Sequence, residues 1–267
     1  MQNWDLIDQK VKKWLTDARE RIINSFEQVL DIETKSNRND LVTNIDKETE
    51  QFFIANIRKE FPNHQILGEE GFGDQLTSLD GIVWIIDPID GTMNFVHQQC
   101  NFAISIGIYE DGVGKLAYIY DVVHQELYYA KAGHGAFLNE RQLPKLEDQV
   151  QLADAVIAMN ATWLTHNRYM DPTNLQKLVN NVRGTRSYGS AALEFAYVAA
   201  GRLDAYITMR LSPWDFAAGK IIVEELGGRV TNLAGEELNL LEKNSIIVAK
   251  PQLHKDIVEK YLLHDRQ

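Results

Sequence analysis

The chain has 267 residues, of which 45% are apolar and 24% are charged, and these are ordinary proportions for a soluble globular protein. Its length suffices for one large domain or for two lobes that share a core. The formal net charge of −11 argues against a nucleic-acid or anionic-membrane surface, because such partners require a basic footprint. An anionic substrate would also be repelled unless cations lie between it and the protein.

Cys100 is the only cysteine, which excludes an intramolecular disulfide and a thiolate zinc site. We expect it to be a small buried side chain rather than a nucleophile. The N-terminus has no basic segment followed by an apolar run, and no stretch approaches the length of a membrane span. We therefore expect a cytoplasmic protein that does not contact membranes.

A long amphipathic helix is predicted at the N-terminus, because apolar residues from Trp4 to Val29 recur at steps of three and four. Residues 35–40 are all polar and predict an exposed loop. A second helix is predicted to begin near Thr43, with Asp46 as its capping-box partner, and to end before Pro62.

Strands are predicted in the middle of the chain. The continuous apolar run at 82–86 is typical of a strand buried on both faces. Alternating residues at 103–109 and 116–120, with a turn at 111–112 between them, predict a hairpin. A further strand is predicted at 126–130.

Strands and helices alternate in the second half of the chain. Strands are predicted at 156–159, 203–208 and 245–250, and helices at 174–179, 191–200, 214–226 and the C-terminus. No solenoid repeat or low-complexity linker is present. This mixture predicts a layered α/β architecture rather than a helix bundle or a β-sandwich.

One segment has an unusual charge pattern. Between Lys59 and Lys115 there is no lysine or arginine, whereas nine carboxylates occur there. Two carboxylates held about 4 Å apart repel each other by roughly 4 kcal/mol at an effective dielectric constant of about 20. Distant basic residues, retained protons or bound cations must therefore offset the repulsion. A solvated acidic surface does not explain Asp87, which follows five apolar residues directly.

Residues 87–92, Asp-Pro-Ile-Asp-Gly-Thr, can bring oxygen atoms together. Pro88 restricts the direction in which the chain leaves the strand, and Gly91 permits a backbone conformation closed to other residues. Thr92 is expected to cap a helix that begins around residue 93. The two aspartates and the carbonyl of Ile89 are ligands that suit Mg²⁺, and the free amides of the helix can bind a phosphate.

Four segments resemble the signature segments of the inositol monophosphatase family. They are Leu-Val-Thr-Asn-Ile-Asp at 41–46, Gly-Glu-Glu at 68–70, the run Trp-Ile-Ile-Asp-Pro-Ile-Asp-Gly-Thr-Met-Asn-Phe-Val-His at 84–97, and Pro-Trp-Asp at 213–215. Their order and spacing fit across nearly the whole chain. The resemblance implies the layered αβαβα sandwich of the inositol monophosphatase and fructose-1,6-bisphosphatase type, usually a homodimer. It also implies a magnesium-dependent, lithium-sensitive phosphatase.

The resemblance further implies a single catalytic unit over 1–267, with an N-terminal α+β lobe (about 1–140) and a C-terminal α/β lobe (about 141–267). The implied reaction is hydrolysis of a phosphate monoester by direct attack of a Mg²⁺-activated water, with two to three Mg²⁺ in the active site. The implied metal ligands are Glu69, Asp87, the carbonyl of Ile89, Asp90 and Asp215. The implied catalytic residues are Glu69, Thr92 and Asp46.

Several of these residues allow a simpler interpretation. Ser212, Pro213 and Asp215 form a good helix start, so Asp215 could merely complement the helix dipole. Asp46 could likewise be only a helix-start carboxylate. Lys35 matches a family lysine near the active site but could be a surface lysine. For Glu70 we expect a second-sphere or solvent-facing carboxylate.

The residues expected to contact the substrate are Lys35, Asp90, Gly91, Thr92, Gly189, Ser190, Ala191 and Thr208. The family's inositol-binding glutamate falls on Thr208, which cannot form the charge-assisted pair of a carboxylate with a diol. Residues 160–163 also depart from the family pattern.

Inositol monophosphate is the expected substrate. The alternatives are fructose 1,6-bisphosphate, the 2′-phosphate of NADP(H) and a nucleoside bisphosphate, for which Arg210 could face a second anionic group or remain a surface arginine. An alternative of another class is a regulatory protein that binds a transcription partner. The expected partners are a small phosphorylated substrate and a second copy of the chain, without direct nucleic-acid contact.

Overall fold

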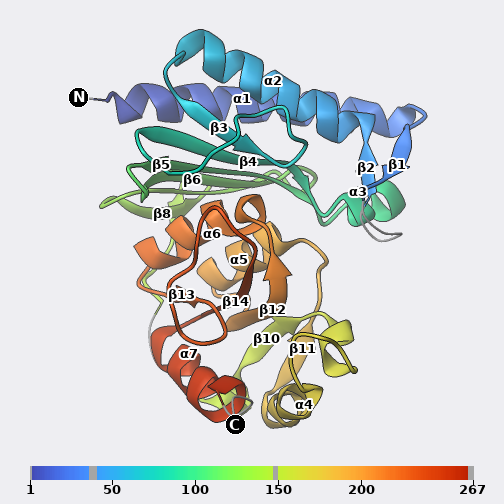
Figure 1. The fold of residues 1–267 in the computed structure, drawn as a ribbon, viewed down its shortest axis with the longest axis vertical. Helices are drawn as coiled ribbons and strands as arrows, with labels where there is room; N and C mark the ends of the chain where they lie inside the picture. Colours follow the sequence, from blue (N-terminus) through green and yellow to red (C-terminus); the bar gives the residue numbers. More distant parts are fainter. Residues whose placement is uncertain (1, 36–40, 147–149, 264–267) are drawn as a thin grey trace.

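The structure is a computed structural model that describes residues 2–35, 41–146 and 150–263. Its elements stack in five layers (Figure 1). Helices α1 and α2 cover the outer face of a seven-stranded sheet, α5 and α6 lie between this sheet and a five-stranded sheet, and α4 and α7 cover the far side. The expected αβαβα sandwich is therefore confirmed.

The seven-stranded sheet has the order β3-β4-β5-β6-β7-β8-β9. Only its first pair, β3 with β4, is parallel among the pairs of this sheet. The predicted hairpin is present as β5 and β6, and the predicted turn lies between them. The strands are β3 (Gln65–Gly68), β4 (Ile82–Asp90), β5 (Ala103–Glu110), β6 (Val113–Asp121), β7 (Glu126–Lys131), β8 (Gly135–Leu138) and β9 (Arg141–Gln142).

The five-stranded sheet has the order β11-β10-β12-β14-β13. Strand β10 pairs in parallel with β11 and β12, and β14 runs antiparallel to β12 and β13. Its strands are β10 (Val156–Met159), β11 (Gly184–Arg186), β12 (Ala205–Leu211), β13 (Arg229–Thr231) and β14 (Asn244–Ala249). A separate two-stranded sheet joins β1 (Ile32–Thr34) to β2 (Leu41–Thr43).

The predicted helices all occur. They are α1 (Trp4–Asn24), α2 (Asn44–Glu60), α3 (Thr92–Gln98), α4 (Pro172–Asn181), α5 (Ala191–Ala199), α6 (Pro213–Glu225) and α7 (Pro251–Ile257), which continues into a π-helical turn, η4 (Val258–Leu262). Short 3₁₀ turns are η1 (Ser25–Glu27), η2 (Leu152–Asp154) and η3 (Ala161–Leu164). No helix among the described residues is both long and apolar enough to cross a membrane.

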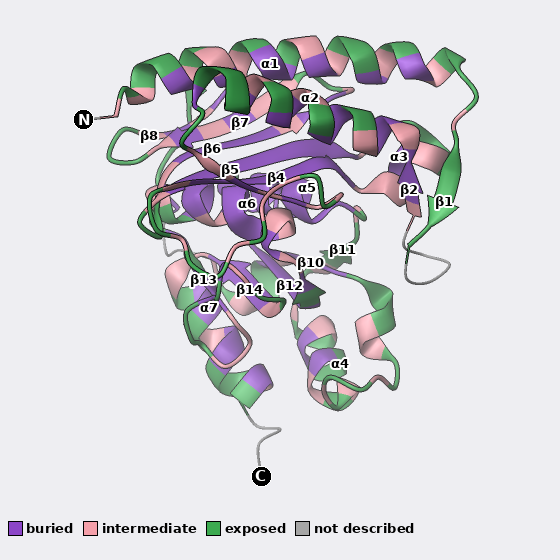
Figure 2. Cartoon of the chain, turned by 45° about the horizontal axis from the view of Figure 1, so that its top comes forward, coloured by how far each residue is buried: buried purple, intermediate pink, exposed green. Residues whose placement is uncertain are grey.

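Three apolar cores separate the layers. One packs α1 and α2 onto the large sheet, a second surrounds α5 and α6 between the sheets, and a third lies between the five-stranded sheet, α4 and α7. Figure 2 shows that the central strands of the large sheet and the two helices beneath it are almost wholly buried. The site described below lies at the boundary of the first two cores.

Three expectations about local structure were wrong. Helix α1 ends at Asn24, and Val29 beyond it is 98% exposed, so the apolar pattern was extended too far. Thr92 is the first residue of α3 rather than its cap, because Gly91, with φ of +95°, occupies the capping position. Cys100 is only half-buried. Of the predicted polar loop, residues 36–40 lie outside the described residues.

Candidate active site

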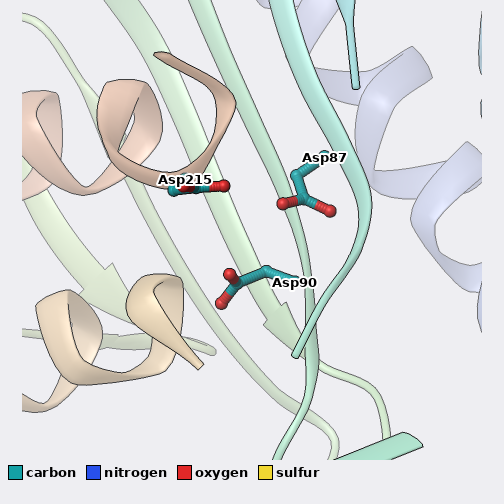
Figure 3. A group of neighbouring side chains, drawn as sticks. All are labelled: Asp87, Asp90 and Asp215. Atoms are coloured by element: carbon teal, nitrogen blue, oxygen red, sulfur yellow. The ribbon is translucent and has the colours of Figure 1, made fainter. Parts of the chain in front are cut away.

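Asp87 and Asp90 meet a third aspartate, Asp215, which is distant from them in sequence. Asp87 and Asp90 lie at the end of β4, and Asp215 lies in the first turn of α6. One carboxylate oxygen from each lies within 4.8 Å of the others, and in Figure 3 all three carboxylates border one common space. Strand β4 continues through Asp90 with an irregularity between the two aspartates, which directs both side chains toward α6.

Two of these carboxylates are removed from water, because Asp87 is 1% and Asp90 is 7% exposed. Asp215 is half-buried. Burial, followed by the charges of Glu69, Asp90 and Asp215, raises the pKa of Asp87 well above its ordinary value. Burial and the charges of Asp90 and Glu69 do the same for Asp215. The cluster can therefore be fully ionised only where positive charge is supplied to it.

Asp90 is fixed by the start of α5. Its Oδ2 accepts hydrogen bonds from the hydroxyl of Ser190 and from the backbone amide of Ala192, the latter at 2.8 Å. Burial raises the pKa of Asp90, and these hydrogen bonds limit the rise, to about 6. Since Oδ2 is engaged in this way, Oδ1 is the oxygen left for a metal ion or a substrate hydroxyl.

Asp215 also has two functions. Its Oδ2 accepts a hydrogen bond from the backbone amide of Ser212 at 2.8 Å, and the two residues form a capping box at the start of α6. The helix-start interpretation therefore describes one oxygen of Asp215. It does not exclude the metal role, because the same side chain belongs to the three-carboxylate cluster.

Asp46 likewise serves two partners at once. Its Oδ2 accepts hydrogen bonds from the amide of Thr43 at 3.0 Å and from the hydroxyl of Thr43, which forms the predicted capping box of α2. Its Oδ1 accepts a hydrogen bond from the hydroxyl of Thr92 at 2.9 Å. The Thr92 hydroxyl also lies 3.1 Å from the carbonyl oxygen of Ile89. Burial raises the pKa of Asp46 to about 6.

Glu69 lies beside Asp87, within hydrogen-bonding reach of its side chain. The ammonium of Lys35 contacts Glu69 Oε1 at 2.9 Å and Glu70 Oε1 at 2.6 Å. Lys35 is therefore an ion-paired residue at this site rather than a free surface lysine. Burial lowers its pKa, but the two carboxylates outweigh burial and raise it.

Glu70 departs from the expectation of a solvent-facing carboxylate, because its side chain is only 3% exposed. Burial raises its pKa to about 7, although the hydrogen bond from Lys35 opposes this rise. The ammonium is shared between two carboxylates, and this explains why pairing does not keep Glu70 acidic.

Glu50, which the sequence analysis did not single out, holds the loop that carries Glu69. Its Oε2 accepts the backbone amide of Glu70 at 2.7 Å, and its Oε1 accepts that of Phe72 at 3.0 Å. The side chain is 0% exposed. Gly68 leaves room for it, since a Cβ at that position would lie 2.5 Å from the Glu50 carboxyl group.

A pocket of about 230 Å³ opens beside two of the aspartates, Asp90 and Asp215. Of the expected substrate contacts, Asp90, Gly189, Ser190, Ala191 and Thr208 line it, whereas Lys35, Gly91 and Thr92 do not. Its further lining residues include Asn160, Trp163, Ser187, Glu194 and Tyr206.

Glu194 and Tyr206 were not singled out from the sequence. The Tyr206 phenol lies near the side chains of Glu194 and Thr208, and the three residues line the pocket together. Burial raises the pKa of Glu194 to about 7. A lone carboxylate inside the apolar run of α5 was the available signal, because such residues are rarely buried without a partner.

Comparison with known proteins agrees with this geometry. Residues 4–264 match the model of the inositol monophosphatase family. The chain is 60% identical over 262 residues to inositol-1-monophosphatase of Bacillus subtilis, covering 98% of each chain. It is 39% identical over 237 residues to fructose-1,6-bisphosphatase/inositol-1-monophosphatase of Thermotoga maritima, covering 87% of this chain and 86% of the other.

A solved structure extends the similarity to the fold. The crystal structure of SaIMPase-II with inositol monophosphate bound superposes with a TM-score of 0.87 at 43% sequence identity. The match covers 96% of this chain and 93% of the other.

Proposed function

This chain belongs to the inositol monophosphatase family and is a phosphoric monoester hydrolase that uses Mg²⁺, and we propose that its substrate is inositol monophosphate. The observation that carries the proposal is the cluster of Asp87, Asp90 and Asp215, which adjoins a pocket large enough for a small ester. The relative that shares 60% of its residues is an inositol-1-monophosphatase.

The residues of the cluster fit Mg²⁺. They offer only carboxylate oxygens, which this hard cation prefers, and their burial demands positive charge. We propose that Glu69, Asp87 and the carbonyl of Ile89 hold one ion, that Asp87, Asp90 and Asp215 hold a second, and that Glu69 serves a third through water. When bound, Mg²⁺ supplies positive charge at the phosphoryl group and lowers the pKa of a water molecule.

Thr92 and Glu69 are proposed to orient the attacking water. The Thr92 hydroxyl directs its hydrogen toward Asp46 Oδ1 and the carbonyl of Ile89, so its lone pairs remain available to accept a hydrogen bond from water. The Glu69 carboxylate accepts the second hydrogen. Asp46 acts through Thr92, because it fixes the direction of the hydroxyl.

The substrate is proposed to lie in the pocket that contains Thr208. Asp90 Oδ1, with its other oxygen held by α5, is placed to accept a hydrogen bond from a substrate hydroxyl. Gly189, Ser190 and Ala191 form the side of the pocket at the start of α5. Lys35 is proposed to approach the phosphoryl group from the side of Glu69.

A second candidate substrate class is the bisphosphates. Thr208 offers a neutral hydroxyl where the family places an inositol-binding carboxylate, so the pocket repels an additional anionic group less strongly. The T. maritima relative carries the name of a fructose-1,6-bisphosphatase as well.

We further propose that the protein is a cytoplasmic homodimer, inhibited by lithium, in which the lobes of about 1–140 and 141–267 act as one catalytic unit. The support for a single unit is that the cluster takes Asp87 and Asp90 from the first lobe and Asp215 from the second. No direct contact with nucleic acid is proposed, in keeping with the net charge of −11.

The test is release of phosphate from inositol monophosphate, fructose 1,6-bisphosphate, NADP⁺ and a nucleoside bisphosphate with millimolar Mg²⁺, then with lithium and with EDTA added. The expected result is the highest kcat/KM for inositol monophosphate, with loss of activity in EDTA. A higher kcat/KM for a bisphosphate would instead select the second candidate.

A further inference from the structure

A larger cavity, of about 880 Å³, adjoins the same segment of β12 as the catalytic pocket. Thr208 and Leu211 line the catalytic pocket, whereas Met209 and Arg210 line the larger cavity. The two spaces have no lining residue in common. Consecutive residues of one strand therefore form the walls of two separate sites.

The larger cavity concentrates positive charge in an acidic protein. Arg168, Arg210 and Lys243 line it, and among the described residues none of the three forms an ion pair. Its one lining carboxylate, Asp171, already caps α4, accepting the amide of Thr173 at 2.9 Å. The three side chains are exposed, and the charge of Lys243 also opposes the rise in the pKa of Asp215. Three cations without ion pairs at one cavity of a chain with a net charge of −11 favour an anionic ligand there.

Tyr169 lies within this positive region and links the two cavities. Arg168 donates a hydrogen bond to its phenol at 3.0 Å. That bond, together with the charge of Arg210, holds the pKa of Tyr169 below its ordinary value. Its ring packs edge-on against Trp163, which lines the catalytic pocket, with 5.7 Å between the ring centroids.

We propose that this cavity is a second ligand site that binds a phosphorylated small molecule, separate from the site at which the monoester is hydrolysed. Arginine guanidinium groups match the oxygen geometry of a phosphoryl group, and the volume suits a metabolite. Asp90 and Asp215 of the three-carboxylate cluster line the other pocket, and none of the three aspartates lines this cavity, so this ligand is bound and not hydrolysed.

Binding of inorganic phosphate to metal-free protein tests the site, because in EDTA the catalytic carboxylates repel an anion. We expect saturable binding by calorimetry in wild type and in Asp87→Asn, weakened at least tenfold in the double variant Arg210→Gln/Lys243→Gln. The matched control is Lys13→Gln/Arg58→Gln, which removes the same charge from exposed positions elsewhere. Equal weakening of phosphate binding in this control would overturn the proposal, and so would loss of binding in Asp87→Asn. Binding in wild type that does not saturate would indicate an adventitious ion only and would overturn it as well.

A kinetic measurement separates a free ligand from the second phosphate of a bisphosphate substrate. If the site is separate, Arg210→Gln should change how the rate of inositol monophosphate hydrolysis depends on the concentration of added phosphate. A rise in KM confined to fructose 1,6-bisphosphate would instead make the cavity part of the substrate site and refute a separate one. The melting temperature of each variant checks that it is folded.

Glu50 carries an independent inference about the proposed metal site. Its carboxylate accepts the amides of Glu70 and Phe72, and these residues follow Glu69 in the same loop. Glu50 also lies one helical turn beyond Asp46 on α2. One turn of α2 thus holds Thr92 through Asp46 and the Glu69 loop through Glu50.

We infer that Glu50 is a positioning residue for Glu69, an inference that rests on the proposed metal role of Glu69. Glutamine at this position keeps the size of the side chain, but its NH2 group is a donor. It would face one of the two backbone amides, which then loses its acceptor. We expect Glu50→Gln to raise the Mg²⁺ concentration for half-maximal activity about tenfold and to speed amide exchange of the segment 68–73.

Asp121→Asn is the matched control. Asp121 is also a fully buried carboxylate that accepts two loop amides, those of Val123 and His124, but its hydrogen bonds hold the loop after β6 and not the loop that carries Glu69. This variant should lose stability without any change in Mg²⁺ requirement. If Glu50→Gln also loses stability without a change in Mg²⁺ requirement, Glu50 has only a structural role and the inference fails.

Gly68→Ala keeps the Glu50 carboxylate but places a Cβ 2.5 Å from it, so it should raise the Mg²⁺ requirement as Glu50→Gln does. An unchanged requirement in this variant would contradict the inference. Glu69→Gln serves as the reference: if it leaves the Mg²⁺ requirement unchanged, the metal role of Glu69 fails, independently of Glu50.

Discussion

The hydroxyl of Thr92 donates a hydrogen bond to Asp46 across 2.9 Å, although 46 residues separate the two in the chain. The bond joins the start of α2 to the start of α3, and Asp46 holds it with the one oxygen that its capping box leaves free. The orientation of the proposed water-binding hydroxyl is therefore set by the fold before substrate arrives.

Thr92→Ala should lower kcat about 100-fold, the usual contribution of a group that orients or transfers a proton, with little change in KM. Thr92→Ser keeps the hydroxyl and should restore most of the activity. The melting temperature should barely move in Thr92→Ser and should fall somewhat in Thr92→Ala, because the buried carboxyl of Asp46 then loses the hydrogen bond from this hydroxyl. An alanine variant with wild-type kcat would remove Thr92 from the mechanism.

Asp46→Asn should differ from Thr92→Ala in stability. Asparagine has one acceptor oxygen where aspartate has two, so it cannot accept hydrogen bonds from Thr43 and from Thr92 in their present positions. Either the capping box or the link to Thr92 is therefore lost. If the capping box is lost, the free energy of unfolding should fall by about 1 kcal/mol. Denaturant titration of the two variants side by side measures the difference, and equal stabilities would indicate that asparagine keeps the cap.

Asp215→Asn should abolish activity at millimolar Mg²⁺, by about 100-fold or more, because stabilisation by a metal ion is worth several kcal/mol. Without Mg²⁺, its melting temperature should equal or exceed that of wild type. The variant removes a charge that burial already disfavours, and asparagine can still accept the amide of Ser212. Substantial residual activity would leave Asp215 only its capping role.

The metal-free protein should become less stable as pH rises. The pKa of Asp46 and of Asp90 is raised from 3.8 to about 6, and that of Glu70 from 4.5 to about 7, by burial first. A raised pKa means that the folded state binds these protons more tightly. The stability that they contribute is therefore fully present below the ordinary values and is lost as pH rises through about 6 to 7.

Melting temperatures in EDTA between about pH 5 and pH 8 check this sign. Mg²⁺ binds the ionised carboxylates, so its stabilising effect should grow over the same interval. Asp90→Asn keeps an oxygen for Ser190 and Ala192 but removes one titrating group, and it should show a shallower slope. A melting temperature in EDTA that rises across this interval would contradict the prediction.

The aspartates of the three-carboxylate cluster, which we propose as metal ligands, could be predicted because each occurs in a recognisable local pattern. Asp87 follows a strand that is wholly apolar, and Asp215 follows Ser212 and Pro213 at a helix start. Such patterns leave open which of two roles a carboxylate takes. In the structure, one oxygen of Asp46 belongs to the capping box of α2 and the other accepts a hydrogen bond from Thr92. Asp215 caps α6 through Oδ2, and its side chain also belongs to the three-carboxylate cluster.

Glu50 and Glu194 were not singled out because their partners are backbone amides or a distant phenol. Glu50 acts on Glu70 and Phe72, which are 20 and 22 residues away, and no local spacing reveals such a contact. The Thr92 error has a similar origin, since the left-handed conformation of Gly91 moves the cap back by one residue. Strands of three residues, such as β11 and β13, could not be predicted because they are too short to show an alternation of apolar and polar residues.

Lys35→Gln should lower the Mg²⁺ concentration for half-maximal activity. The ammonium lies 2.9 Å from Glu69 and competes with a cation for the same carboxylate. Since the pair is partly exposed, we expect a decrease of up to about fivefold, equivalent to about 1 kcal/mol. If Lys35 also contacts the phosphoryl group, KM rises in the same variant. An increased Mg²⁺ requirement would show that Lys35 does not compete with the metal.

Thr208→Val tests where substrate selectivity lies. Valine has nearly the shape of threonine but lacks the hydroxyl, which lies beside Tyr206 at the pocket. If this hydroxyl contacts a substrate alcohol, kcat/KM for inositol monophosphate should fall about two- to tenfold, the value of one neutral hydrogen bond. Hydrolysis of p-nitrophenyl phosphate, which has no alcohol group, should be unchanged and provides the internal control. Equal decreases in kcat/KM for both substrates would mean that Thr208 supports the pocket without contacting the substrate alcohol. Selectivity would then depend on Asp90 and the start of α5.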